Sequence, residues 1–104
     1  MGHVFLCHAE EDASLVERLA ELLERDGFRT WYYERDQPPG SNFLVQVSHA
    51  IQTCAAMIVV LSPASLKSKY VGMEIILAVK HCPFLPLLRE LTMKQLSEAR
   101  PDWA

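Results

Sequence analysis

Hydrophobic residues in this chain form short apolar segments that alternate with longer segments of mixed polarity. Short apolar runs bounded by polar or turn residues are typical of buried strands, and apolar residues repeating every three or four positions are typical of amphipathic helices. The short runs predict four strands, within residues 3–7, 28–33, 54–61 and 84–88. The third run shows no polar alternation, which favours a parallel strand covered on both faces.

The segments between these runs predict four helices. In the first helix, apolar residues at helical spacing define one face: Leu15, Val16, Leu19, Leu22 and Leu23. Charged residues fill the opposite face, and Gly27 is expected to end the helix. The side chain of Asp12 or Ser14 is expected to cap its beginning. The other three helices are expected at about residues 43–51, 64–81 and 92–99.

This alternation of strands and helices predicts an α/β fold with a parallel sheet and right-handed crossovers, in one domain over residues 1–104. Open sheets of this kind bind ligands beyond the carboxyl ends of their strands, where the strand order reverses. The flavodoxin-like order, assumed at this point, puts the crevice between the first and third strands. Its two sides are then His8 and Ala9, and Ser62 and Pro63.

Composition and charge narrow the set of partners. The chain has 104 residues, a net charge of −3 and no basic tract, so nucleic acid is a poor partner. The longest apolar run, Ala55 to Leu61, is far shorter than the roughly 20 residues of a membrane helix, so no membrane association is expected. Three cysteines cannot all pair within one chain. Reduced thiols and a cytoplasmic location are therefore expected.

Glu74 is the polar exception in an apolar stretch over residues 71–79. A carboxylate beside apolar surface can have a raised pKa, which suits acid–base chemistry. The alternative is that Glu74 belongs to a solvated helix face, since Lys67, Glu74 and His81 are spaced by seven residues. The pattern alone leaves both interpretations open.

Several common sites are disfavoured. A phosphorylated receiver domain would need an aspartate after the third strand, where the chain has Ser62 and Pro63. The acidic residues after the first strand are more simply explained by helix capping. The chain has no Gly-rich phosphate-binding motif, and no metal site is expected because His81 and Cys82 have no partner pair. Cys7 is interpreted as a buried structural thiol.

Five segments, in order, resemble the motifs of a Toll/interleukin-1 receptor (TIR) domain, particularly of bacterial and NAD-cleaving members. Each motif alone is weak, but the ordered set covers residues 4 to about 88 and is specific. The segments are residues 4–8, 27–31, 33–40, 51–63 and 70–74.

The resemblance implies a flavodoxin-like three-layer sandwich and identifies Glu74 with the catalytic glutamate of NAD-cleaving TIR domains. NAD+ is then a substrate and no cofactor is required. Residues expected to contact the substrate are His8, Ala9, Tyr33, Ser62 and Tyr70. A loop over residues 34–42 is expected to dock on a neighbouring TIR domain; an ordinary connection with caps at Ser41 and Asn42 is the alternative. The interaction residues are Glu34, Arg35, Asp36, Pro38, Pro39 and Gly40.

Three departures from the family pattern qualify this resemblance. The chain ends at Ala104, where family members continue into a fifth strand and helix, so the expected sheet has the order 2-1-3-4, an exposed edge at the fourth strand and an absent or truncated fifth strand. His8 and Ala9 replace an aromatic residue and an arginine, and Tyr70 replaces a tryptophan.

The leading functional hypothesis is an NAD+ hydrolase that is activated by self-association in signalling or immune defence. The first alternative is a non-enzymatic module that recruits other TIR domains, and the second is a cyclase that makes a cyclic ADP-ribose signal. The presence of Glu74 favours an enzyme, since a pure scaffold does not need it.

Overall fold

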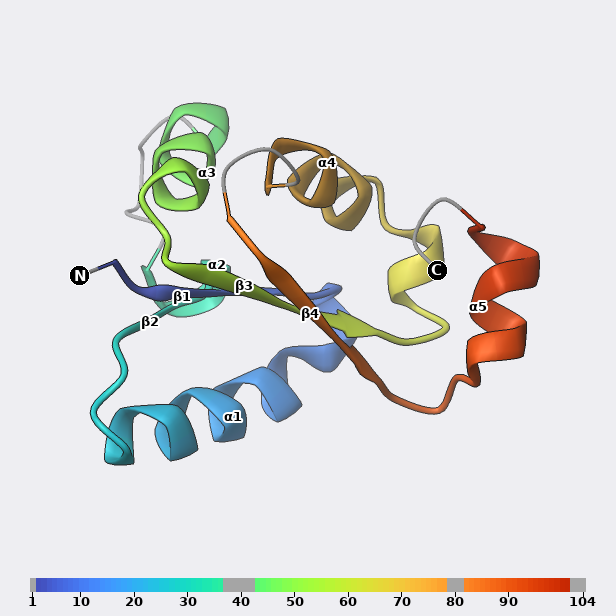
Figure 1. Cartoon of the computed structure of the whole chain (residues 1–104), viewed down its shortest axis with the longest axis horizontal. Helices are drawn as coiled ribbons and strands as arrows, with labels where there is room; N and C mark the ends of the chain where they lie inside the picture. Colours follow the sequence, from blue (N-terminus) through green and yellow to red (C-terminus); the bar gives the residue numbers. More distant parts are fainter. Residues whose placement is uncertain (1, 37–42, 79–81, 102–104) are drawn as a thin grey trace.

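Four parallel strands form the centre of the molecule, in the order β2-β1-β3-β4 (Figure 1). The computed structural model describes residues 2–36, 43–78 and 82–101. The strands are β1 (Val4–Cys7), β2 (Thr30–Trp31), β3 (Ala56–Leu61) and β4 (Phe84–Leu88). The order confirms the predicted flavodoxin-like arrangement, with its reversal between β1 and β3.

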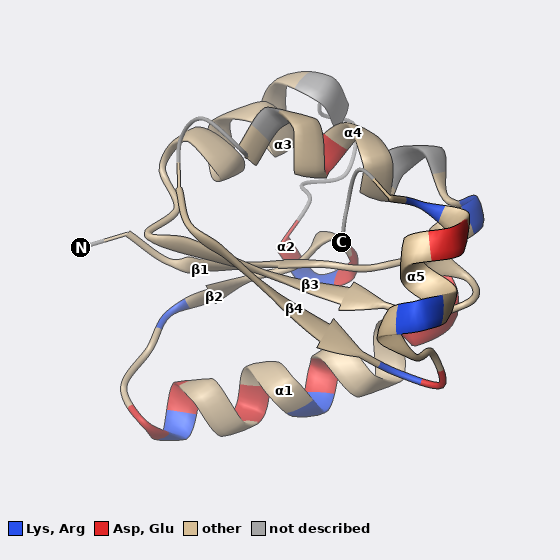
Figure 2. Cartoon of the chain, turned by 45° about the vertical axis from the view of Figure 1, so that its right-hand side comes forward, with Lys and Arg blue, Asp and Glu red and all other residues tan. Residues whose placement is uncertain are grey.

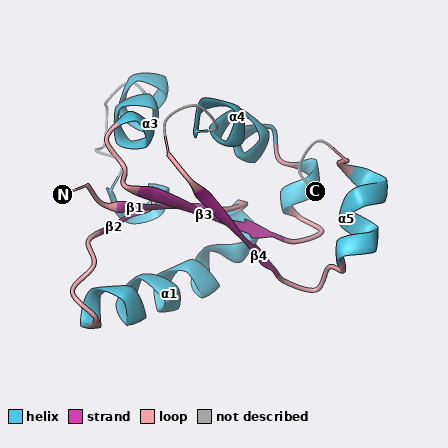
Figure 3. Ribbon diagram, viewed as in Figure 1, coloured by secondary structure: helices cyan, strands magenta, loops and turns pink. Residues whose placement is uncertain are grey.

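Helices cover both faces of the sheet, which gives three layers (Figure 3). Helix α1 (Ala13–Arg25) lies on one face, and α3 (Phe43–Gln52) and α4 (Lys69–Ala78) lie on the other. Helix α5 (Met93–Ala99) lies beyond the carboxyl end of β4. Three shorter helical segments complete the described chain: η1 (Glu10–Asp12), α2 (Tyr33–Asp36) and η2 (Ser65–Lys67).

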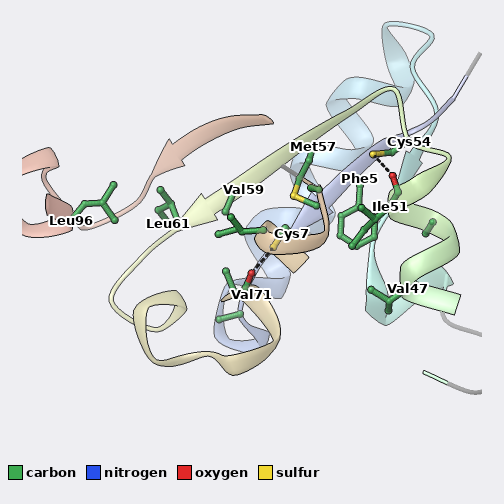
Figure 4. Packing of buried hydrophobic residues seen from close by; sticks show 14 residues of the cluster. Phe5, Cys7, Val47, Ile51, Cys54, Met57, Val59, Leu61, Val71 and Leu96 are labelled. Atoms are coloured by element: carbon green, nitrogen blue, oxygen red, sulfur yellow. Dashed lines mark hydrogen bonds between the residues drawn. The ribbon is translucent and has the colours of Figure 1, made fainter. Parts of the chain in front are cut away.

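Alternate side chains of each strand enter different apolar clusters, because successive residues of a strand point to opposite faces. Phe5 and Cys7 of β1, with Met57 and Val59 of β3, pack in the cluster beneath α3 and α4 (Figure 4). Leu6 packs in the second cluster, beneath α1. The central strands β1 and β3 are therefore buried on both faces, as the uniformly apolar sequence of β3 predicts.

Most residues of the apolar face predicted for helix α1 pack against the sheet, but Leu22 is exposed. Val16 and Ala20 are buried. Acidic and basic residues occur along the length of the helix (Figure 2). Gly27 follows the helix with a φ of +90°, a backbone conformation that residues with a side chain rarely adopt. The glycine thus lets the chain turn back toward β2.

The second strand is shorter than predicted, and the predicted loop begins with a helical turn. Residues 28–33 were expected to be extended, but only Thr30–Trp31 pair with β1, and α2 starts at Tyr33. Asp36 closes this turn, because its side chain accepts a hydrogen bond from the Tyr32 N–H (3.0 Å) and its own N–H donates to the Tyr32 carbonyl (3.0 Å). Residues 37–42 of the predicted loop, with Pro38, Pro39 and Gly40, lie outside the described residues.

The predicted helix over residues 64–81 is two helices, η2 and α4, separated at Ser68. The backbone of Ser68 is extended, and its Oγ accepts a hydrogen bond from the Val71 N–H (3.2 Å). Such side-chain caps compete with helical backbone bonds and mark a new helix start. Residues 79–81 lie outside the described part.

Asp12 occupies the N-cap position of α1, as one of the two predicted alternatives, but its side chain makes no capping hydrogen bond because it contacts Ser62 and Arg89 instead. Ser14, the other alternative, lies within the helix. The exposed edge at β4 is confirmed within the described residues: β4 pairs only with β3, and Leu85 and Leu87 are exposed. No helix among the described residues has the length and apolar content to cross a membrane.

Candidate active site

A cavity of about 550 Å³ lies beside β1, between α2 and the start of α4. We call it the Glu74 cavity. Its lining includes two apolar residues of β1 and carboxyl groups from three other segments. Its lining residues are Phe5, Leu6, His8, Glu10, Tyr33, Glu34, Ser68 and Glu74. The cavity therefore lies on the β1 side of the predicted switch point.

Glu74 is buried in this cavity, with a relative exposure of 6%. Burial raises the pKa of its carboxyl group to about 7, and the negative charge of Glu34 acts in the same direction. A hydrogen bond with the Cys7 thiol opposes this shift in the pKa. The solvated-face interpretation of Glu74 is thus wrong, since α4 turns this residue inward while Lys67 is exposed.

Cys7 contacts Glu74 and is completely buried. Its Sγ is 4.0 Å from the Val71 carbonyl oxygen (Figure 4), and burial together with the Glu74 carboxylate raises the pKa of the thiol well above its ordinary value. The thiol therefore stays protonated and acts as a donor. The predicted structural role of Cys7 agrees with this burial, but its contact with Glu74 has no local sequence signal.

His8 and Glu34 meet at the edge of the same cavity. The His8 Nε2 lies 2.7 Å from Glu34 Oε1, and the His8 Nδ1 lies 3.0 Å from the Leu6 carbonyl oxygen. The His8 side chain is only 3% exposed, whereas that of Glu34 is 34% exposed. Glu34, predicted for an interaction loop, thus contributes to the cavity that also contains Glu74.

Arg35 fixes the position of α2. Its guanidinium lies 2.7 Å from Glu24 Oε2, 2.6 Å from the Thr30 carbonyl oxygen and 2.8 Å from Asp36 Oδ2. It also lies 4.6 Å from the centre of the Tyr32 ring, a cation–π contact. Hydrogen bonds to Asp36 and Glu24 raise the pKa of Arg35 further. These contacts hold the predicted interaction residues Arg35 and Asp36 against α1 and β2.

The other predicted substrate residues are placed differently. Tyr33 lines the cavity, but Ala9 and Ser62 are buried and do not. The Ser62 hydroxyl donates to the Asp12 carboxylate and accepts from the Ser65 N–H (3.2 Å). The side chain of Tyr70 lies outside the described part of the structure.

Four of the lining residues were not predicted from the sequence as site residues: Phe5, Leu6, Glu10 and Ser68. Ser68 carries a usable signal, because a serine three residues before an apolar helical stretch is a common cap. The strand residues carry none, since apolar residues of a buried strand look alike whether or not one of them borders a cavity.

This arrangement suits a reaction in which positive charge develops. A carboxyl group with a pKa near 7 exists in both protonation states at neutral pH. Its ionised form stabilises a neighbouring cation strongly, because the apolar surroundings screen charge poorly. The cavity therefore combines the buried carboxyl group of Glu74 with the more exposed carboxyl group of Glu34, which His8 contacts.

The comparisons with known proteins agree with the fold. The profile described as "TIR domain" matches residues 4–103, so the chain belongs to the TIR domain family. In the TIR domain of the Toll-related receptor TRR-2 from Hydra magnipapillata, 79% of the chain superposes on 94% of this one, with a TM-score of 0.80 and 28% identity.

Two curated relatives have names that describe ADP-ribose or NAD+ chemistry. The 2′ cyclic ADP-D-ribose synthase BtTIR of Bacteroides thetaiotaomicron is 27% identical over 96% of this chain and 37% of its own length. The NAD(+) hydrolase TcpA of Theionarchaea archaeon (strain DG-70-1) is 34% identical over 69% of this chain and 22% of its own length. The chain thus spans less than two fifths of either relative.

Proposed function

We propose that this TIR domain hydrolyses NAD+ to nicotinamide and ADP-ribose, with Glu74 as the catalytic residue. The observation that carries the proposal is the burial of Glu74 in a cavity beside β1. An interaction module has no need for a carboxyl group whose burial raises its pKa to about 7. The names of the two curated relatives support the same chemistry.

The chemistry follows from the charge on the substrate. The bond between the ribose C1′ and the nicotinamide nitrogen breaks, and its electron pair passes to that nitrogen, so nicotinamide leaves as a neutral molecule. Positive charge then develops on the ribose, as in glycoside hydrolysis. The ionised Glu74 carboxylate stabilises this charge, and water adds at C1′ to give ADP-ribose and a proton.

The lining of the cavity supplies the remaining contacts. Tyr33 offers an exposed aromatic side chain for contact with the nicotinamide ring. The positive charge of the bound nicotinamide ring favours ionisation of Glu74. The substrate thus promotes the protonation state that its own cleavage requires.

The direct test is to incubate the concentrated domain with NAD+ and to follow nicotinamide by chromatography. Release of nicotinamide with an equal amount of ADP-ribose is the expected result. Absence of nicotinamide release at high protein concentration and under crowding would contradict the proposal and favour the interaction module.

A cyclase is the second candidate, because the cyclic ADP-ribose synthase relative matches 96% of this chain. In that reaction a group of the ADP-ribose itself, in place of water, forms the new bond to C1′. Both reactions release nicotinamide, so mass spectrometry of the second product distinguishes them. Cyclic ADP-ribose is one water lighter than ADP-ribose.

A further inference from the structure

His8 lies between two hydrogen-bond acceptors. Its Nδ1 is 3.0 Å from the Leu6 carbonyl oxygen, which can only accept, so Nδ1 carries a hydrogen. Its Nε2 is 2.7 Å from Glu34 Oε1, so a second proton lies between these two atoms. Hydrogen bonds at both ring nitrogens therefore fix the orientation of the His8 side chain.

Two features of Glu34 bear on its role in the cavity. The hydrogen bond to His8 Nε2 holds one carboxyl oxygen of Glu34, Oε1, in a fixed place. The side chain of Glu34 is also 34% exposed, whereas Glu74 is 6% exposed. The two carboxyl groups therefore share one cavity, and Glu34 is the more accessible of the two to solvent.

We propose that Glu34, positioned by His8, is the base that accepts the proton of the attacking water. The inference rests on the proposed NAD+ cleavage and assigns a role to a second carboxyl group in it. As the oxygen–C1′ bond forms, one O–H bond of that water breaks and its proton passes to Glu34 Oε2. The proton then leaves to solvent, and Glu74 remains the group that stabilises the ribose cation.

A nucleophile that loses no proton when it attacks can distinguish a catalytic base from a residue with a structural role. A pyridine such as 3-acetylpyridine attacks C1′ through its ring nitrogen and loses no proton, giving an exchanged dinucleotide. Water must lose a proton, so only hydrolysis needs a base. The ratio of exchanged dinucleotide to ADP-ribose therefore reports on the base, independently of the total rate.

The test compares the wild type with Glu34→Gln in NAD+ and 3-acetylpyridine. The glutamine amide can donate to the Nε2 of a neutral His8, so the contact is retained while the proton acceptor is lost. We expect the product ratio to shift toward exchange by about tenfold or more, since general base catalysis contributes typically 10²–10⁴-fold. Glu34→Asp, which keeps the carboxylate but shortens it, should shift the ratio less.

Glu24→Gln is the matched control. Glu24 contacts Arg35 from α1 and helps to hold α2, but it does not line the Glu74 cavity. If Glu34→Gln acted only by loosening α2, Glu24→Gln would change the product ratio in the same way. The expected result is that Glu24→Gln leaves the ratio unchanged.

Two outcomes would overturn the inference, and they are distinguishable. Equal loss of exchange and hydrolysis in Glu34→Gln, at an unchanged ratio, would show that Glu34 is not the base while NAD+ cleavage stands. No nicotinamide release by the wild type would overturn the proposed function, and this inference with it.

Discussion

The carboxylate of Asp12 accepts a hydrogen bond from the Ser62 hydroxyl, and this contact joins the segments that follow β1 and β3. The other carboxylate oxygen, Oδ1, lies 3.0 Å from Arg89 Nη1, immediately after β4. Asp12 thus connects the carboxyl ends of three neighbouring strands. The network holds the edge of the sheet beside which the Glu74 cavity opens.

Removal of this carboxylate should destabilise the domain. Asp12→Ala leaves the buried Ser62 hydroxyl without its acceptor and removes the partner of Arg89. Loss of a buried hydrogen-bonded partner costs about 1–3 kcal/mol of the free energy of unfolding, measured by urea denaturation. Glu11→Ala, at an exposed acidic neighbour, is the control. Equal losses for the two variants would show that the network contributes nothing specific.

Glu74→Gln should abolish NAD+ cleavage and preserve the fold. Glutamine has nearly the same shape but cannot carry the negative charge that the developing ribose cation requires. Loss of such a group typically lowers the rate by roughly a hundredfold or more. Nicotinamide release measures the rate, and circular dichroism checks the fold. A variant that cleaves NAD+ at the wild-type rate would show that Glu74 is not catalytic.

The raised pKa of Glu74 predicts that the stability of the domain depends on pH. The pKa of Glu74 is raised from 4.5 to about 7 in the folded chain, mainly by burial. The folded chain therefore binds this proton more tightly than the unfolded chain, and its contribution to stability is complete below pH 4.5 and is lost as the pH rises through 7. The free energy of unfolding, compared with that of Glu74→Gln, should fall by about 3 kcal/mol across this interval.

Urea denaturation of both proteins at several pH values between 4 and 8 measures this difference. NAD+ cleavage should change in the opposite direction and increase as the pH rises through about 7, because the ionised carboxylate is the active form. A difference between the two proteins that is constant with pH would mean that Glu74 ionises as freely as an exposed glutamate.

The cysteines should react with thiol reagents in the order of their burial. Cys82 is half-buried and should react first; Cys54 is buried, and burial together with Cys82 raises its pKa to about 12. Cys7 is fully buried, with a strongly raised pKa, and should react last. Alkylation followed by peptide mass spectrometry gives the three rates, with urea-unfolded protein as the reference. Fast alkylation of Cys7 in the folded protein would indicate an accessible thiol.

Self-association should control the activity. We expect NAD+ cleavage per molecule to increase steeply with protein concentration or crowding, because clustering raises the effective concentration of neighbouring domains. Glu74→Gln at the same concentrations is the control for cleavage by contaminants. Activity per molecule that stays constant over a hundredfold range of concentration would contradict control by assembly.

Much of the fold is determined by local sequence pattern. The uniformly apolar residues of β3 predict a strand covered on both faces, and the helical spacing of Leu15, Val16 and Leu19 predicts a helix with one face against the sheet. Gly27 similarly predicts the end of α1. These signals are readable because a strand or helix places neighbours in sequence at fixed positions relative to one another.

The environment of each site residue was decided by the tertiary structure alone. The spacing of Glu74 was equally compatible with a solvated face, and only the packing of α4 beside β1 buries its carboxyl group over Cys7. Asp12 has the sequence context of a helix cap, yet Ser62 and Arg89, distant in sequence, compete for its carboxylate.

The contact of Glu34 with His8 was likewise not predictable from the local sequence. The position of Glu34 beside proline and glycine residues indicates a loop, but the contact with His8 joins residues 26 positions apart. The local sequence pattern predicts helices and strands, because the backbone conformation of a residue depends largely on its neighbours along the chain. The hydrogen-bond partners of Glu34 and Asp12 are distant residues that folding brings together, so only the tertiary structure decides them. The same holds for the raised pKa of Glu74, because it results from burial.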